Sequence, residues 1–352
     1  MIKNFKIMSK TLIIGLLGGI CFNLLLLPLP WMLGPAFFVA IFALCGTHVQ
    51  IHPNLRNPFV GIIGVWLGSY FSSSLFLDAY NWFPSIIMLI IFIPSVHFIT
   101  YLTLHKVRGM SKPDAFFTGS PGGLLEMVLG AEECGADGKQ VALAHMIRIF
   151  LTVMLVPNLI LFFFPDSFSR LAVWPDLSGS FFDLLIMLLL VPVGLFFGKY
   201  LKIPGYRMFG PLICSAILHL SNLVSLDLPI SSLIIAQIIT GSYFGSNMNG
   251  ISWNVAKNYI TNAIIALACL GILMLPFILI VSFITSISPE ALILAYSPGG
   301  VNEMGLVAVL LQIEPAYVIT HHLFRLILVL IILSLAKKYF YPRFKLLLKI
   351  KS

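Results

Sequence analysis

The residues of this chain that could do chemistry are present twice. A Ser-Pro-Gly-Gly run, a Glu-Met pair and a His-x-x-Arg sequence follow one another in each half, and an offset of 177 residues relates the two sets. The surrounding sequence is almost entirely apolar. A duplicated helix break that carries charged residues in such a sequence predicts a paired site inside a membrane. The predicted site residues are Ser120, Pro121, Gly122, Gly123, Glu126, His145 and Arg148 in the first half, and Ser297, Pro298, Gly299, Gly300, Glu303, His322 and Arg325 in the second.

Each Ser-Pro-Gly-Gly run predicts a tight turn between two short helices, because proline removes a backbone donor and glycine frees the backbone. The helix after such a turn begins with unpaired N–H groups that suit an anion. The helix before it ends with carbonyl groups that suit Na⁺. Many secondary transporters place such breaks near the middle of the membrane. The alternative is a simple turn at the membrane surface.

The two arginines are predicted to lie near the membrane midplane. Arg148 is about nine residues into the apolar segment 140–163, and Arg325 is about ten residues into the segment 315–336, which corresponds to roughly 13–15 Å of helix. A charge at that depth needs a partner or an aqueous cavity, and Glu126 and Glu303 are the expected counter-ions. Two interpretations stay open: an Arg–Glu clasp that only locks each hairpin to its helix, and a clamp for a substrate carboxylate or phosphate.

The histidines could relay protons, because an imidazole titrates near neutrality. A buried His that is hydrogen-bonded to a carboxylate is the alternative interpretation. His321 has no counterpart, since position 144 is Ala. One paired His per half gives poor metal-ligand spacing, so neither a metal nor another cofactor is expected. No nucleophile elbow, phosphate loop or haem signature is present in the sequence, and we do not expect an enzyme.

Composition places the chain among helical membrane proteins. Hydrophobic residues make up 59% and charged residues only 10%, against about 25% charged in soluble proteins. The mean hydropathy is +1.02. Strands of a membrane β-barrel would alternate polar and apolar residues, and these segments do not. The lipid bilayer is therefore an expected partner and nucleic acid is not, because no soluble face exists on which the net charge of +8 could form a patch.

Ten apolar segments predict membrane-spanning helices, five in each half. Segments 113–135 and 289–313 have arms too short for a span of about 20 residues and predict re-entrant hairpins, with broken spanning helices as the alternative. The predicted domains are a first membrane repeat (1–164), a linker (165–181), a second membrane repeat (182–336) and a basic cytoplasmic tail (337–352). The ten segments are 11–28, 32–48, 58–75, 84–104, 140–163, 182–200, 209–224, 228–246, 259–286 and 315–336.

Further matches extend the repeat beyond the charged motif. Gly34-Pro35 matches Gly210-Pro211 at an offset of 176, and Pro113-Asp114-Ala115 matches Pro289-Glu290-Ala291 at the same offset. Gly68-Ser69-Tyr70-Phe71 matches Gly241-Ser242-Tyr243-Phe244 at an offset of 173. Anchors in the same order indicate duplication.

Loop charge favours re-entrant hairpins and inverted repeats. With five spans per half and the N-terminus inside, 18 of the 21 Lys and Arg residues face the inside. Arg170 lies outside, and Arg148 and Arg325 lie in the membrane. This asymmetry is the one that the positive-inside rule expects, so we predict that both termini are cytoplasmic.

The duplicated Ser-Pro-Gly-Gly-x-x-Glu-Met and His-x-x-Arg sequences resemble the AbrB-duplication family of bacterial integral membrane proteins, and the resemblance extends over nearly the whole chain. It implies a multi-pass protein of the bacterial inner membrane. The family carries two labels, regulator of gene expression and ammonia monooxygenase. The first differs from the small DNA-binding AbrB, whose swapped β-hairpins this sequence cannot form. The second is unsupported by any copper or iron ligand set.

The function expected from these residues is secondary transport of a small solute, anionic and coupled to H⁺ or Na⁺, through a midplane site. A membrane sensor that affects gene expression indirectly is the alternative, and a membrane oxidoreductase comes third. A homodimer is a further expectation, by analogy with other carriers that contain hairpins.

Overall fold

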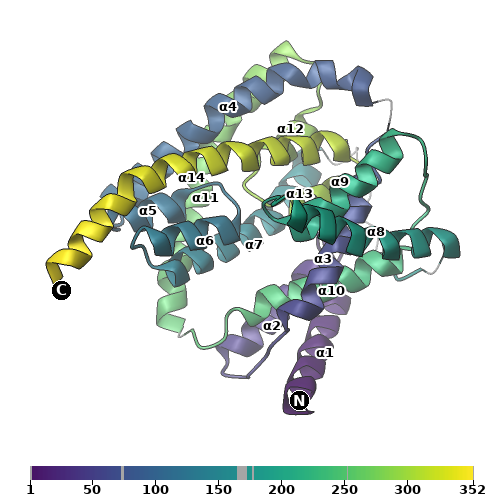
Figure 1. Ribbon diagram of the computed structural model, residues 1–352, viewed down its shortest axis with the longest axis horizontal. Helices are drawn as coiled ribbons and strands as arrows, with labels where there is room; N and C mark the ends of the chain where they lie inside the picture. The colour runs from purple at the N-terminus through teal and green to yellow at the C-terminus, as the bar shows by residue number, and fades with distance from the viewer. Residues whose placement is uncertain (1, 73–74, 165–172, 177, 252, 352) are drawn as a thin grey trace. The chain divides into compact units, whose positions relative to one another are not determined.

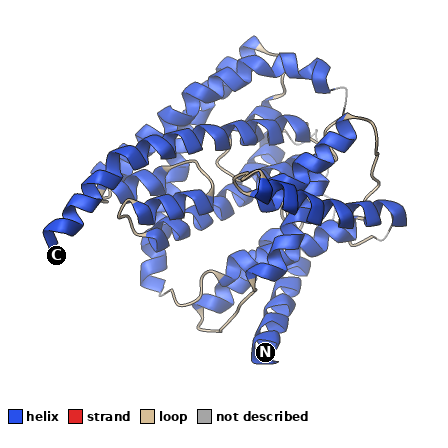
Figure 2. Ribbon diagram, in the orientation of Figure 1, coloured by secondary structure: helices blue, strands red, loops and turns tan. Residues whose placement is uncertain are grey.

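The computed structural model describes residues 2–72, 75–164, 173–176, 178–251 and 253–351. Within these ranges the chain forms fourteen α-helices and no strand (Figures 1 and 2). The helices are α1 (Ile2–Leu24), α2 (Pro30–Leu44), α3 (Pro53–Gly68), α4 (Leu75–Lys106), α5 (Lys112–Gly119), α6 (Leu124–Glu133), α7 (Gly138–Phe163), α8 (Phe181–Tyr200), α9 (Tyr206–Leu220), α10 (Ile230–Ser246), α11 (Trp253–Ile284), α12 (Pro289–Tyr296), α13 (Val301–Leu311) and α14 (Pro315–Lys351).

The all-helical class is confirmed, and each of the ten predicted spans falls on one of these helices. The predicted hairpins correspond to the helix pairs α5–α6 and α12–α13. Six helices are long and apolar enough to cross a membrane, namely α1, α4, α7, α8, α11 and α14. The remaining four of the ten, α2, α3, α9 and α10, have 15, 16, 15 and 17 residues. The count of ten spans therefore stays a prediction.

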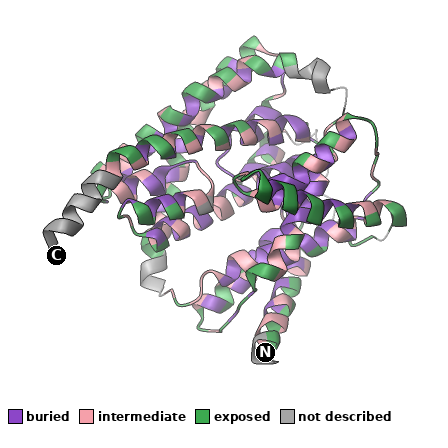
Figure 3. Ribbon diagram, viewed as in Figure 1, coloured by how far each residue is buried: buried purple, intermediate pink, exposed green. Residues whose placement is uncertain are grey.

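The exposed surface differs from that of a soluble protein. Large apolar side chains are exposed along the long helices, such as Phe283 at 90% and Phe162 at 75%, whereas Arg148 and Arg325 are buried. Figure 3 shows exposed residues along the long helices, α4 and α14 among them. Exposed hydrocarbon on long helices fits a lipid solvent, in which charges are kept inside the protein. The chain is a helical membrane protein.

The described residues divide into two compact units, and each contains parts of both sequence halves. The first unit comprises residues 1–79, 157–252 and 305–316, and so holds α1, α2, α3, α8, α9 and α10. The second comprises residues 80–156, 253–304 and 317–352, and so holds α4 to α7, α11, α12 and α14, with the first residues of α13. The predicted linker 165–181 lies largely outside the described residues, and so does Arg170.

Close glycine contacts recur in matched pairs within the first unit. A Cβ on Gly18 of α1 would collide with the backbone of Gly34 of α2, and the same collision relates Gly194 of α8 to Gly210 of α9. Backbones approach this closely only where both helices carry small residues, which is how membrane helices gain packing energy.

A second set of contacts corrects one sequence match. Gly64 of α3 faces the carbonyl of Met208, while Gly241 of α10 faces the carbonyl of Met32. Gly68 and Gly245 face Leu212 and Ala36 in the same way. By these contacts, Gly64 and Gly241 are equivalent positions of the repeat, at an offset of 177. The match of Gly68 to Gly241 at 173 was wrong by one helical turn, because both Gly-rich helices repeat glycine every four residues.

In the second unit, α4 and α11 run antiparallel. Phe92 and Thr103 of α4, and Arg108 just after its end, contact in turn Phe277, Cys269 and Asn262 of α11, so the numbering falls on α11 as it rises along α4. Helix α4 also contacts α5 and α12, the short helices that precede the two breaks.

Gly34→Ala should lower the thermal unfolding midpoint of the detergent-solubilised protein, because the added methyl group collides with the Gly18 backbone. The expected cost is about 1–3 kcal/mol. Gly271→Ala is the matched control, since open space surrounds that position in α11, and it should be neutral or stabilising by up to about 1 kcal/mol. Equal effects of the two changes would contradict the close packing of α1 on α2.

Candidate functional site

The two Ser-Pro-Gly-Gly runs form the predicted breaks between short helices. Ser111 and Ser288 cap the starts of α5 and α12 through their side chains, with a proline in the first turn of each helix. Ser120 and Ser297 follow the last residues of these helices and have extended backbones, with ψ of 132° and 151°. A residue before proline is driven to this conformation. Each short helix therefore ends with main-chain carbonyls that have no helical partner.

In the first copy, side chains of α7 bind these carbonyls. Arg148 Nη1 donates to the carbonyl of Ser120 at 2.7 Å, and His145 Nε2 lies 2.9 Å from the carbonyl oxygen of Phe117. Arg148 Nη2 lies 3.2 Å from His145 Nδ1. Both side chains are buried, at 2% and 0% exposure.

The second copy repeats the arrangement on α14. Arg325 Nη1 donates to the carbonyl of Ser297 at 2.5 Å, and His322 Nε2 lies 3.0 Å from the carbonyl oxygen of Leu294. Arg325 Nη2 also donates to the carbonyl of Gly299. We call each set of contacts an arginine clasp: His145 and Arg148 on Phe117 and Ser120, and His322 and Arg325 on Leu294 and Ser297.

The clasp explains the His-x-x-Arg spacing. Side chains three residues apart lie one turn apart on a helix face, and the carbonyls that they bind are also three residues apart. A cation at a helix C-terminus is further stabilised by the helix dipole, by up to about 2 kcal/mol when partly buried. The arginines therefore bind helix ends.

The glutamates have a second neighbour besides the arginines that the sequence analysis expects, and their pairing with the arginines stays a prediction. Each carboxylate lies over the second glycine of its break: a Cβ on Gly123 would meet Glu126 Oε2, and one on Gly300 would meet Glu303 Oε2. Since Gly123 is the N-cap of α6, Glu126 stands at the third helical position, where a carboxylate can cap the helix start. In the second copy Glu303 also lies within electrostatic range of Arg325.

The same contacts account for both glycines of each run. A Cβ on Gly299 would collide with Met304 of the motif. A Cβ on Gly122 would collide with Val329 of α14 and lie tightly against Met127. Gly123 itself has φ −64°, which any residue can adopt, so the requirement is for space. The Glu-Met pair thus fills the room that Gly-Gly leaves.

The two histidines differ at Nδ1. His145 Nδ1 accepts from Arg148, so Nε2 carries the proton and donates to the Phe117 carbonyl; this imidazole is neutral with both nitrogens used. His322 donates through Nε2 in the same way, but its Nδ1 has no hydrogen-bond partner. The alternative to a proton relay was a buried His that is hydrogen-bonded to a carboxylate. The hydrogen bonds of His145 and His322 go to other groups. A proton relay through them stays a prediction.

One residue that sequence analysis missed supports the first clasp. His97 of α4 lies with Nε2 3.0 Å from the carbonyl oxygen of Phe116, beside the carbonyl that His145 binds. It is 3% exposed. A lone His in an apolar span was the available signal, because buried titratable residues in membrane helices are costly.

Some of the buried polar atoms that have no hydrogen-bond partner lie at the breaks and in the clasps. Among the described residues they include Thr118 Oγ1 and Ser120 Oγ at the first break, Asn302 Oδ1 after the second, and Arg148 Nε and His322 Nδ1 in the clasps. All five residues are at most 8% exposed. An unsatisfied buried polar group costs about 1–3 kcal/mol, so these atoms favour a polar occupant.

The hairpins contact opposite ends of α4. The α5–α6 hairpin lies near its C-terminal end, where Leu104, Met110 and Ala115 form a buried cluster. The α12–α13 hairpin lies near its N-terminal end, where Tyr296 Oη donates to the carbonyl of Ser85 at 2.6 Å.

Helix α14, like α4, contacts the second hairpin near its N-terminal end and the first hairpin further along. The first part of α14 clasps the second hairpin through Arg325, and later residues hold the first: Val329 and Leu333 pack against Gly122 and Gly130, and Lys337 pairs with Glu133 at 2.6 Å.

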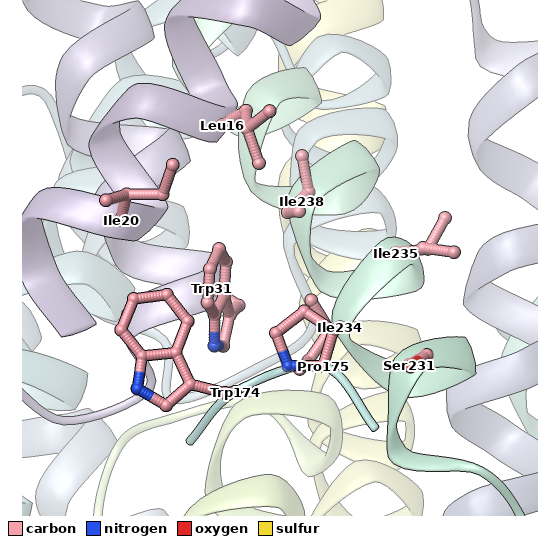
Figure 4. A pocket seen from close by; sticks show the side chains of 9 residues that line it. All are labelled: Leu16, Ile20, Trp31, Trp174, Pro175, Ser231, Ile234, Ile235 and Ile238. Atoms are coloured by element: carbon pink, nitrogen blue, oxygen red, sulfur yellow. The ribbon is translucent and has the colours of Figure 1, made fainter. Parts of the chain in front are cut away.

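An apolar pocket of about 330 Å³ lies elsewhere, in the first unit. Side chains of α1, α2 and α10 and the segment at Trp174 surround it, and none of the predicted site residues lines it (Figure 4). Its lining is apolar, so it lacks the polar groups that orient a solute. Within the residues that the structure describes, no three His, Cys, Asp or Glu side chains are placed to hold a metal ion.

Comparison with known proteins matches residues 31–341 to the family described as transition state regulatory protein AbrB. The chain is 27% identical over 344 residues to the Bacillus subtilis (strain 168) protein named "Uncharacterized protein YhjN", covering 90% of this chain and 88% of that one. It is 26% identical over 238 residues to an Escherichia coli (strain K12) protein with the provisional name regulator AbrB, covering 66% of this chain and 67% of that one.

Glu303→Ala should lower the unfolding free energy by about 0.5–2 kcal/mol, the usual value of an N-terminal cap. Gly300→Ala should cost about the same, because its methyl group displaces the flexible Glu303 carboxylate from the same position. The double variant should then lose no more than either single one, as measured by thermal unfolding. Gly299→Ala, which collides with Met304 instead, is the control and should add to Glu303→Ala. Additive losses for Gly300→Ala would contradict the assigned position of the carboxylate.

Proposed function

The chain belongs to the AbrB family that matches nearly all of its length, and we propose that it is a secondary transporter that binds a small anion at its two clasped helix breaks. The observation that carries this proposal is the duplicated arginine clasp, which holds two opened helix ends and two cations inside one compact unit. Broken helices at membrane depth are tolerated where they line a cavity, and transporters bind solutes at such breaks.

Charge favours an anion as the solute. Arg148 and Arg325 lie within electrostatic range of each other, and the carboxylate of Glu303 lies in range of Arg325. Arg148 is bonded to a main-chain carbonyl and to a neutral imidazole, neither of which cancels its charge. A buried cation is stable only when it is paired, so the two sites together attract at least one further negative charge.

Free donors near the first break can bind that charge. Arg148 Nε and the hydroxyls of Thr118 and Ser120 are buried and have no partner. The N-terminus of α6 adds backbone N–H groups and its positive dipole end. A carboxylate or phosphate fits this donor set, because the planar guanidinium group matches both in shape.

Two inverted repeats in a bacterial inner membrane, with ten spans and both termini inside, complete the proposal. The placement of the hairpins at opposite ends of α4 supports it. Each arginine lies ten residues after the start of its helix, or about 15 Å, which is close to the middle of a hydrocarbon layer of about 30 Å. Helices of 15 to 17 residues fit the spans of the first unit if the bilayer thins locally around them.

Purified full-length protein should show a higher thermal midpoint with at least one anion of a panel containing acetate, succinate, phosphate and sulfate. Arg148→Met and Arg325→Met should weaken that binding by about 10- to 100-fold, the value of one charge-assisted hydrogen bond. Arg148→Lys keeps the charge without the planar fork, and should bind with intermediate affinity. Lys337→Met is the matched control, because it removes a cation paired with Glu133 at a partly exposed position.

The same anion should then enter liposomes that contain the protein. Binding without uptake would support the alternative, a membrane sensor that acts through a partner, which is the role suggested by the family description and by the name of the E. coli relative. Wild-type affinity in all three arginine variants would overturn the anion site.

Single cysteines on a cysteine-free background test the topology. Ser178→Cys should react with an impermeant maleimide from outside intact cells, whereas Lys112→Cys should react only after the cells are opened. Both positions are exposed, so burial does not limit labelling. Labelling of both sites from the same side would contradict inverted repeats.

A further inference from the structure

A second buried polar network lies beside the clasp of α14. His321 Nε2 is 2.5 Å from Ser85 Oγ, and Ser85 Oγ is 2.6 Å from Tyr317 Oη. His321 Nδ1 lies 2.9 Å from the carbonyl oxygen of Tyr317. Tyr296 Oη donates to the carbonyl of Ser85. Ser85, Tyr296, Tyr317 and His321 are at most 1% exposed.

Hydrogen bonding gives this network a direction. The carbonyl of Tyr317 can only accept, so His321 Nδ1 carries the proton and Nε2 is the acceptor. Ser85 then donates to His321, and Tyr317 Oη donates to Ser85. The hydrogen bonds therefore run from Tyr317 to Ser85 and from Ser85 to His321, where the last acceptor is the lone pair of Nε2.

Three of the four residues of this network come from the second sequence half and have no counterparts in the first. At the offset of 177 residues, His321, Tyr317 and Tyr296 correspond to Ala144, Gln140 and Gly119. The clasps are duplicated and the network is not, so a clasp can form without it. Because the repeat duplicates the clasps and not this network, we infer that the network has a separate role.

We propose that His321, with Ser85 and Tyr317, binds the proton that is coupled to anion binding at the clasps. This inference rests on the proposed function and identifies the coupling ion as H⁺. On protonation, Nε2 takes up a proton from solvent, keeps it, and becomes a hydrogen-bond donor to Ser85 Oγ. The Ser85 hydroxyl then turns toward Tyr317 Oη, and the Tyr317 hydroxyl turns away. Release reverses both rotations and returns the proton to solvent.

Coupling follows from position. His321 stands four residues before Arg325, so the two share a helix face one turn apart. A proton on His321 adds positive charge beside the anion site, and an anion bound there favours the proton in return. The other titratable groups around His321 are Tyr296 of α12 and Tyr317 and His322 of α14. From α4, Ser85 contacts His321 and Trp82 packs against Tyr317, and neither carries a charge.

The test is a titration of the full-length protein in nanodiscs, with ¹⁵N-labelled histidine followed by NMR between about pH 5 and about pH 8, the range of an imidazole. Wild type should show a titrating resonance that is absent from His321→Ala, a change to the residue of the first repeat. The panel anion that binds best should bind on the order of tenfold more tightly at the acid end. His321→Ala and Ser85→Ala should remove this pH dependence, whereas His105→Gln, near the C-terminal end of α4, should keep it.

Each failure has a separate reading. A His321 resonance that stays neutral throughout the range overturns the proton site whatever the anions do. Anion binding whose pH dependence survives His321→Ala also overturns it, and leaves the anion site standing. If no panel anion binds at any pH, the proposed function fails, and the titration alone decides the proton site. A purely structural His321 would lower the thermal midpoint when changed without altering the pH dependence.

Discussion

The structure of the second unit depends on hydrogen-bond donors for the main-chain carbonyls at the ends of two short helices, which lie away from water. A carbonyl without a partner in hydrocarbon costs several kcal/mol, and each Ser-Pro break leaves such carbonyls at the end of an eight-residue helix. The neighbouring long helix supplies the donors, one turn apart, to carbonyls one turn apart. Without this match, a short helix that ends inside the protein would have no stable end.

Each part of the repeated motif then has one physical task. Ser-Pro stops the first short helix, Gly-Gly leaves space, and Glu-Met fills that space from the second short helix. His and Arg come from the next helix and close the clasp. Holding the breaks open with cations makes the centre of the unit positive, and this links the packing of the hairpins to the kind of solute that they could bind. Membrane proteins retain such buried charges mainly at functional sites.

Much of this architecture could be predicted from sequence. Apolar length predicted the helices, and Pro-Gly-Gly predicted both breaks, since these signals are local. The partners of Arg148 could not be predicted, because a sequence shows side chains and the acceptor is the main-chain carbonyl of Ser120. Glu126 was the nearest opposite charge in the sequence, and it lies over Gly123. Ser85 and His97 belong to no motif, and only the fold brings them to the hairpins.

The central claim is that the guanidinium groups bind the carbonyls at the ends of the short helices. Solid-state NMR of the protein in lipid bilayers can measure this directly, as the dipolar coupling between arginine side-chain ¹⁵N and serine carbonyl ¹³C. We expect a short-range coupling from Arg148 to Ser120 and another from Arg325 to Ser297, matching N–O distances of 2.7 and 2.5 Å. Strong couplings to the carboxyl carbons of Glu126 and Glu303, with none to the serine carbonyls, would contradict the arginine clasp and restore a simple ion pair.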